Sequence, residues 1–207
     1  MKRKKFVSIE EIADFLDYRL RNNSNINRTK IENILKHLIR KKYIIPGTKL
    51  TKDDILEVPL RAEIFKYIIN NPGTNINEIM NNLNIGSNQI LWHLKFLEKF
   101  QFIRFIKVGN QKVSFNFEMD KKYDIMYFYL RNKNIRKIIK LLENEKKGLN
   151  STKISKILNM HYYTTMKYLE ILNNLKLISM VGEINDNIFY HLNYNNYYDI
   201  LRTLDMV

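Results

Sequence analysis

The stretch "NINEIMNNLNIGSNQILWHLKFLEKF", residues 75–100, is typical of two helices joined by a tight turn. Asn75 and Glu78 form an Asn-x-x-Glu pattern that resembles a capping box and predicts the start of a short helix. In the turn "NIGS", we expect Gly86 to adopt a positive φ, which glycine tolerates best. Ser87 is then predicted to cap the longer second helix. The order predicts a helix-turn-helix.

The flanking sequence predicts a third helix and a hairpin. Pro59 suits the first turn of a helix that "NNPG", residues 70–73, should end. After the longer helix, "FIRFIKVGNQKVSFNF" contains two strand-like runs around Gly109-Asn110, a strong signal for a two-residue β-hairpin. Helix, helix, turn, helix and hairpin is the order of a winged helix-turn-helix.

The chain contains this unit twice. Shifting the sequence by 75 positions aligns residues 60–103 with 135–178 without a gap, and ten of the 44 pairs are identical. The pairs include Arg61/Arg136, Gly73/Gly148 and Asn75/Asn150. A repeat of this kind predicts two copies of one structural unit.

The predicted fold class is mainly α with small β-hairpin wings. We expect an N-terminal helical segment at 1–58, a first winged domain at 59–118 and a connecting helix at 119–132. A second winged domain at 133–193 and a C-terminal helix at 194–207 follow. In the N-terminal segment, Ser8 and Asn27 are predicted to cap helices, and Thr51-x-x-Asp54 to start a short one. This segment is either a degenerate third helix-turn-helix or a helical pair docked on the first winged domain.

The longer helix of the first unit is the predicted DNA-reading element, since the second helix of a helix-turn-helix enters the major groove. Its apolar positions Ile90, Leu94 and Leu97 should face the core. His93 lies beside them and should brace the helix; the four histidines show no chelating spacing. The residues expected to face DNA are Ser87, Asn88, Gln89, Trp92, Lys95 and Lys99. Packing of Trp92 against lysine side chains or an adjacent domain is the alternative for that residue.

The first hairpin is predicted to be a basic wing. Arg104, Lys107 and Lys112 surround the Gly109-Asn110 tip and suit the DNA backbone or minor groove. In the second copy, Glu170 and Asn174 replace Lys95 and Lys99, and the tip carries Glu183 and Asp186. We therefore assign the main DNA-reading role to the first winged domain. In the second, Tyr162, Tyr163, Thr164 and Lys167 are the residues that could still reach DNA.

Composition favours a polyanionic partner and excludes several function classes. Thirty-five Lys and Arg against 21 Asp and Glu give a formal net charge of +14, which favours nucleic acid. The chain has no cysteine, which excludes disulfides and thiol catalysis. We find no apolar run long enough for a membrane span and no phosphate-binding Gly-rich loop or nucleophile–base motif. We expect a cytoplasmic, non-enzymatic protein without cofactor or metal.

The stretch from Val58 to Asn110 resembles the archaeal winged helix-turn-helix regulators of the ArsR/MarR-like group, through Arg-x-x-Ile, "NNPG" and "WHLKFLEKFQFI". With the lead-in "PGTKLT", residues 46–51, the chain is similar to the euryarchaeal archaellum regulators. The resemblance implies transcriptional control by a dimer that activates motility genes. The chain departs from many ArsR repressors in lacking their cysteine pattern, which puts metal-triggered release in doubt.

Two other functions stay open at the level of sequence. A tandem winged-helix chain could be a protein-interaction scaffold of a chromosome or transcription complex, and Tyr123, Met126, Tyr127 and Leu130 would form a docking stripe. The alternative for this stripe is packing into a core. A basic, aromatic surface is also compatible with single strands or RNA. For duplex DNA, the Asn-, Ile- and Lys-rich composition favours an AT-rich promoter region as the target, with contact to the transcription machinery.

Overall fold

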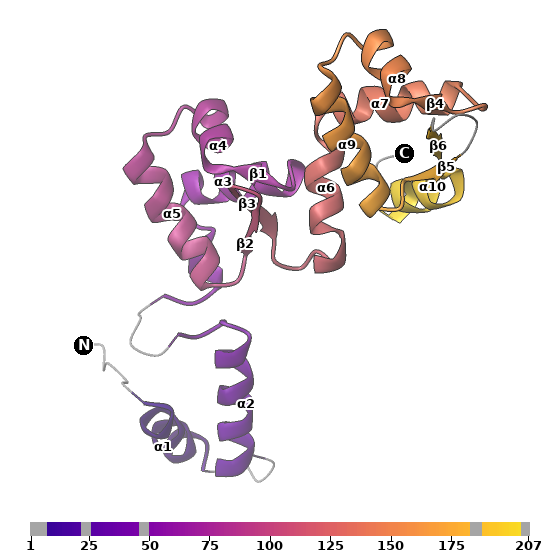
Figure 1. The fold of residues 1–207 in the computed structure, drawn as a ribbon. Helices are drawn as coiled ribbons and strands as arrows, with labels where there is room; N and C mark the ends of the chain where they lie inside the picture. Colours follow the sequence, from indigo (N-terminus) through magenta and orange to yellow (C-terminus); the bar gives the residue numbers. More distant parts are fainter. Residues whose placement is uncertain (1–7, 22–25, 46–49, 183–187, 204–207) are drawn as a thin grey trace. The chain divides into compact units, whose positions relative to one another are not determined.

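The computed structural model describes residues 8–21, 26–45, 50–182 and 188–203, and it divides the chain into two compact units (Figure 1). Unit 1 ends at Lys121 and unit 2 begins at Lys122. The lead-in residues 46–49, the wing residues Glu183 and Asp186, and the last four residues of the expected C-terminal helix lie outside the described residues.

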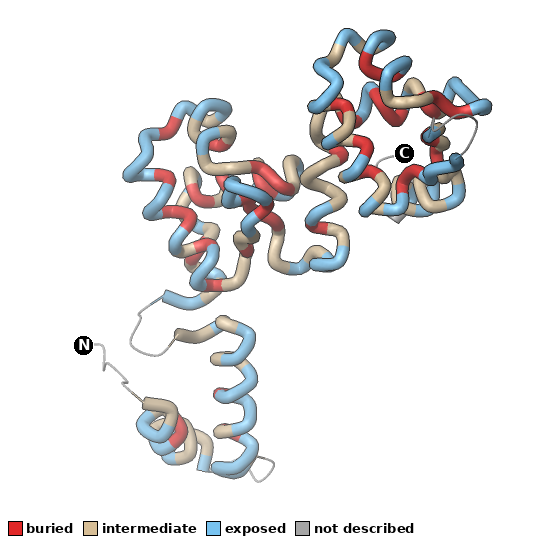
Figure 2. The backbone as a smooth tube through the Cα atoms, in the orientation of Figure 1, coloured by how far each residue is buried: buried red, intermediate tan, exposed pale blue. Residues whose placement is uncertain are grey.

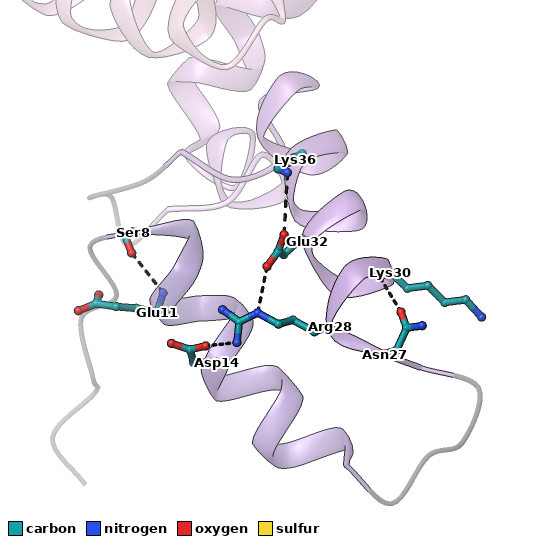
Figure 3. A network of polar contacts seen from close by, with 8 residues as sticks. All are labelled: Ser8, Glu11, Asp14, Asn27, Arg28, Lys30, Glu32 and Lys36. Atoms are coloured by element: carbon teal, nitrogen blue, oxygen red, sulfur yellow. Dashed lines mark hydrogen bonds and ion pairs between the residues drawn. The ribbon is translucent and has the colours of Figure 1, made fainter.

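Unit 1 begins with two helices, α1 (Ile9–Leu20) and α2 (Arg28–Arg40). Each starts at the expected cap: Glu11 N–H donates to Ser8 Oγ at 3.2 Å, and Lys30 N–H to Asn27 Oδ1 at 2.9 Å. Figure 3 shows these caps and the ion pairs by which Arg28 joins Asp14 on α1 to Glu32 on its own helix. The two helices share a small apolar cluster of Ala13, Ile31 and Leu35.

The first repeat follows as helices on a small sheet. A 3-10 turn (Asp53–Ile55) precedes α3 (Pro59–Asn70), β1 (Thr74–Asn75), α4 (Ile76–Leu83) and α5 (Ser87–Lys99). The hairpin β2 (Ile103–Val108) and β3 (Gln111–Asn116) completes an antiparallel sheet of order β1-β3-β2. This order of elements is consistent with a winged helix-turn-helix.

Unit 2 has the same order of elements. A 3-10 turn (Lys121–Tyr123) spans the division between the units, and α6 (Asp124–Leu130) follows it. Then come α7 (Lys133–Asn144), β4 (Leu149–Asn150), α8 (Ser151–Ile157) and α9 (Tyr162–Asn174). The strands β5 (Ile178–Val181) and β6 (Phe189–Leu192) complete a sheet of order β4-β6-β5. The last described helix is α10 (Tyr194–Thr203).

Backbone conformation repeats at the same 75-residue spacing as the sequence. Gly73 and Gly148 have φ of 81° and 69°, and Asn84 and Asn159 have φ of 51° and 49°. Gln101 and Lys176 both have φ of 58°. Left-handed backbone is uncommon outside glycine. Three pairs of left-handed residues at the same spacing therefore indicate that the backbone follows the same course in both repeats.

Two details of the turn before α5 differ from expectation. Gly86 has φ of −67°, and the left-handed residue of the turn is Asn84, which ends α4. The cap position of α5 is Gly86, whose lack of a side chain leaves it without a side-chain hydrogen bond, and Ser87 is the first helical residue. The predictions of a positive φ at Gly86 and a Ser87 cap are therefore wrong. Asparagine tolerates left-handed backbone, so Asn84 has the positive φ that was expected at Gly86.

The aromatic stripe of 123–130 is part of the core of unit 2. Leu130 is buried there, and Tyr123, Met126 and Tyr127 pack against the same cluster. Core packing, the alternative to a docking stripe, is thus what the structure shows. Within the described residues, none of the helices is both long and apolar enough to cross a membrane.

The capping of α4 gives the first testable prediction. Asn75 Oδ1 accepts from Glu78 N–H at 2.9 Å, while Asn75 Nδ2 donates to Glu78 Oε1 at 3.0 Å. We expect Asn75→Ala to lower the free energy of unfolding by about 1 kcal/mol, because the first turn of α4 loses its acceptor. The measurement is urea denaturation.

The control is Asn77→Ala, an exposed position on the same helix. Its unfolding free energy should stay within about 0.5 kcal/mol of the unsubstituted chain. Equal stability of the two variants would show that the cap contributes nothing to the unit.

Candidate nucleic-acid interface

Helix α5 has one buried and one exposed side (Figure 2). Ile90, Leu94 and Leu97 are at most 2% exposed, as the apolar spacing predicts. The six residues expected to face DNA are all exposed: Ser87, Asn88, Gln89, Trp92, Lys95 and Lys99. The structure therefore places these side chains together on the solvent side of one helix.

Leu91 belongs to the same exposed side, and sequence reasoning missed it. Its side chain is 51% exposed, next to Trp92 at 52%. Two adjacent large apolar side chains on the outside of one helix offer an apolar surface that a partner could cover. A thymine methyl group is one such partner in the major groove. The signal in the sequence was the position of Leu91 three residues after Asn88.

Trp92 packs against side chains of its own unit. Its ring meets the His93 ring edge-on at 4.9 Å between centroids and the Phe96 ring at 4.8 Å. The guanidinium carbon of Arg61 lies 5.3 Å from the Trp92 ring centroid and 4.7 Å from that of Phe96. One side of the indole is thus packed on a cation, and the outer half stays exposed.

Arg61 and His93 form a buried polar pair beneath Trp92. Arg61 is 2% exposed and donates from Nη1 to the carbonyl of Ile55 at 2.9 Å. His93 is 5% exposed, and its Nδ1 has no hydrogen-bond partner within the described residues. Burial, and next the positive charge of Arg61, hold the pKa of His93 below its usual 6.5. The neutral imidazole braces α5 from the inside, as expected, and among the described residues no cluster of acids or histidines could hold a metal.

The hairpin presents two lysines side by side. Lys107 lies directly opposite Lys112, in the second pair from the Gly109-Asn110 turn; the pair next to the turn is Val108 and Gln111. Both are exposed, and neither forms an ion pair with a described carboxylate. Lys112 Nζ lies 4.2 Å from the centroid of the Phe105 ring. Like charges directly across a strand pair are destabilising, so the wing carries charge that its fold does not need.

Arg104 does not belong to this basic wing. It is 8% exposed, and its Nη1 donates to the carbonyls of Asn116 and Phe117, the latter at 2.9 Å. The guanidinium satisfies backbone acceptors at the end of β3, and little of the side chain is exposed to a phosphate. This burial argues against the predicted DNA contact of Arg104.

A shallow groove joins the wing tip to the start of α4. Its volume is about 410 Å³, and its lining residues are Asn75, Ile76, Asn77, Asn110, Gln111 and Lys112. Amide side chains, one ammonium group and a helix N-terminus suit an anion such as a phosphate. Of this set, the sequence predicted a DNA contact only for Lys112, because the groove exists only once the hairpin folds back beside α4.

In unit 2, the predicted residues lie at the start of α9. Tyr163 is 77% exposed and stacks on the His161 ring at 5.7 Å, while Tyr162 is 44% exposed. Lys167 is exposed one turn later, and Thr164 is half-buried. The structure thus offers aromatic faces and one cation at this helix end, but Glu170 stands exposed where α5 has Lys95.

No family model matches the chain. A curated protein of Methanocaldococcus jannaschii, named an uncharacterized HTH-type transcriptional regulator, is 33% identical over 141 residues. The aligned part is 68% of this chain and 35% of that protein. The chain thus spans about a third of the length of this relative. The name of this relative agrees with the helix-turn-helix order of both units.

The buried pair gives a prediction about pH. An imidazole whose pKa is lower in the folded than in the unfolded state binds fewer protons when folded. We expect the free energy of unfolding to fall as pH drops through 6.5, the usual His value, toward the lower folded value. In the His93→Gln variant, the fall in the free energy of unfolding that is due to this imidazole should disappear.

Urea denaturation at pH 7.5 and 5.5 measures the effect in both proteins. The exposed His161→Gln variant is the control and should keep the decline of the unsubstituted chain. A decline that survives unchanged in His93→Gln would contradict the assignment to the buried imidazole.

Proposed function

We propose that the chain is a sequence-specific, double-stranded DNA-binding transcription regulator built from two tandem winged helix-turn-helix domains. Helix α5 enters the major groove, and the β2–β3 wing contacts the backbone or minor groove. The single observation that carries the proposal is the exposed side of α5. It combines amides at its amino end with an exposed Leu91–Trp92 pair and lysines further along.

The order of these side chains along α5 matches the two tasks of DNA recognition. Asn88 and Gln89 stand in the first turn, where recognition helices contact base edges, and each amide can pair bidentately with adenine. Lys95 and Lys99 follow about two and three turns later and would neutralise phosphates. Glu98, also exposed there, limits how far phosphates approach the carboxyl end of the helix.

The wing and groove supply the sequence-independent part of binding. Lys107 and Lys112 are unpaired like charges that a phosphate between them would stabilise. The groove beside Lys112 would hold a further phosphate at the start of α4. In unit 2, Tyr162, Tyr163, Thr164 and Lys167 are proposed as a weaker contact surface.

The composition of the chain and the resemblance of residues 46–110 add finer proposals. Composition suggests an AT-rich promoter region as the target. The resemblance suggests binding as a homodimer, contact with the transcription machinery, and activation of archaellum genes in the cytoplasm. Promoters of motility genes are accordingly the first natural duplexes to assay.

The test is selection from a random duplex library, followed by titration of variants. We expect one enriched motif. Asn88→Ala or Gln89→Ala should cost about 1–3 kcal/mol of discrimination at one base pair. Lys99→Ala should instead weaken binding to all sequences alike and reduce the slope of log K against log salt by about one.

The exposed Asn81→Ala on α4 is the matched control and should change neither quantity. Absence of an enriched motif, together with unchanged binding by the α5 variants, would refute the proposal. Capture of one stoichiometric protein partner by a chain that ignores DNA would favour the scaffold alternative.

A further inference from the structure

Helix α7 of unit 2 carries a row of cations on its solvent side. They recur at i, i+3, i+4 and i+7, which places them on one helical face over about 10 Å of axis. We call this row the α7 basic stripe: Lys133, Arg136, Lys137 and Lys140, all exposed. The opposite side of the helix is buried in the core of unit 2 through Ile135, Ile138, Ile139 and Leu142.

No carboxylate among the described residues pairs with the stripe. The acidic residue nearest along the helix is Glu143, whose Oε1 accepts from the Tyr198 hydroxyl at 2.7 Å. Like charges three and four residues apart on a helix repel each other, so the stripe lowers the stability of α7 in isolation. Its positive charge is therefore available for an external anion.

The first repeat shows that the fold does not require the stripe. At the equivalent positions, α3 and the residue before it have Val58, Arg61, Ala62 and Phe65. Only the arginine is shared, and its role differs: Arg61 is buried beneath Trp92, whereas Arg136 is exposed. The position that matches Trp92 is Lys167, which offers no ring to cover an arginine.

Positive charge thus occupies different helices in the two units. In unit 1 it lies on α5 and the wing, while in unit 2 the matching positions on α9 hold Glu170 and Asn174. Unit 2 instead has a row of four exposed cations on the first helix of the repeat. A second surface of the same sign, on a different helix, indicates a different way of meeting a polyanion.

We propose that the α7 basic stripe is a second DNA-contact surface, which binds the phosphate backbone of duplex DNA without base contacts. The inference rests on the proposed DNA-binding function. Lysine is suited to phosphate as a point charge, and backbone contacts fix position without reading sequence. A membrane surface is a less suitable partner for the stripe. The four apolar residues of α7 named above are all buried, so none of them could insert into lipid.

The test compares two charge-matched double variants of the full chain. Lys133→Gln with Lys137→Gln removes two cations from the stripe, and Lys153→Gln with Lys156→Gln removes two exposed cations from α8. Duplex binding is titrated between 50 and 200 mM salt, on the selected motif and on an unrelated sequence. Circular dichroism confirms that both variants fold.

For the α7 double variant, we expect the slope of log K against log salt to decrease by about two, on both sequences equally. Base preference should stay unchanged. The α8 double variant should keep the slope of the unsubstituted chain. That pattern supports a backbone contact at α7.

Three results would overturn the inference while leaving the proposed function intact. They are an unchanged slope in the α7 variant, an equal decrease in both variants, and, in a parallel titration with polyglutamate, loss of polyglutamate binding by the α7 variant while its DNA binding is retained. The last would assign the stripe to an acidic protein partner. If the unsubstituted chain binds no duplex at all, the proposed function fails and the inference fails with it.

Discussion

The exposed face of α5 depends on a guanidinium buried beneath it. Arg61 reaches from α3 to the carbonyl of Ile55 and packs against the rings of Trp92 and Phe96, with neutral His93 alongside. A buried cation with few hydrogen bonds is costly, and burial lowers the pKa of Arg61. What this arrangement provides is a packed support for Trp92. The indole contacts Arg61, His93 and Phe96 on one side, and about half of the side chain stays exposed.

The two repeats show one scaffold carrying two surfaces. Paired left-handed residues, such as Asn84 and Asn159, and paired asparagine caps keep the path of the chain the same. The cores repeat as well, since Leu94 and Leu97 match Leu169 and Leu172. Charge differs on the outside, where nothing in the packing constrains it. Under the proposed function, unit 1 reads bases, and unit 2 adds contact to the backbone.

Sequence predicted the features set by local chemistry. The caps at Ser8, Asn27 and Asn75 and the Gly109 hairpin each depend on a few neighbouring residues, and the structure confirms them. The burial of Arg104 was not predicted, although its alternation with Ile106 and Val108 placed it on the apolar side of the hairpin. Its acceptors, the carbonyls of Asn116 and Phe117, come near only when β3 pairs with β2. The burial of Arg61 and the groove at Lys112 likewise depend on contacts distant in sequence.

Trp92 is the only tryptophan of the chain, so its fluorescence reports on the proposed interface directly. Acrylamide quenching, measured without DNA and with saturating duplex of the selected motif, tests whether the exposed half of the indole becomes covered. The account predicts a quenching constant several-fold lower in the complex. A quenching constant that stays the same at saturation would contradict the insertion of α5 into the groove.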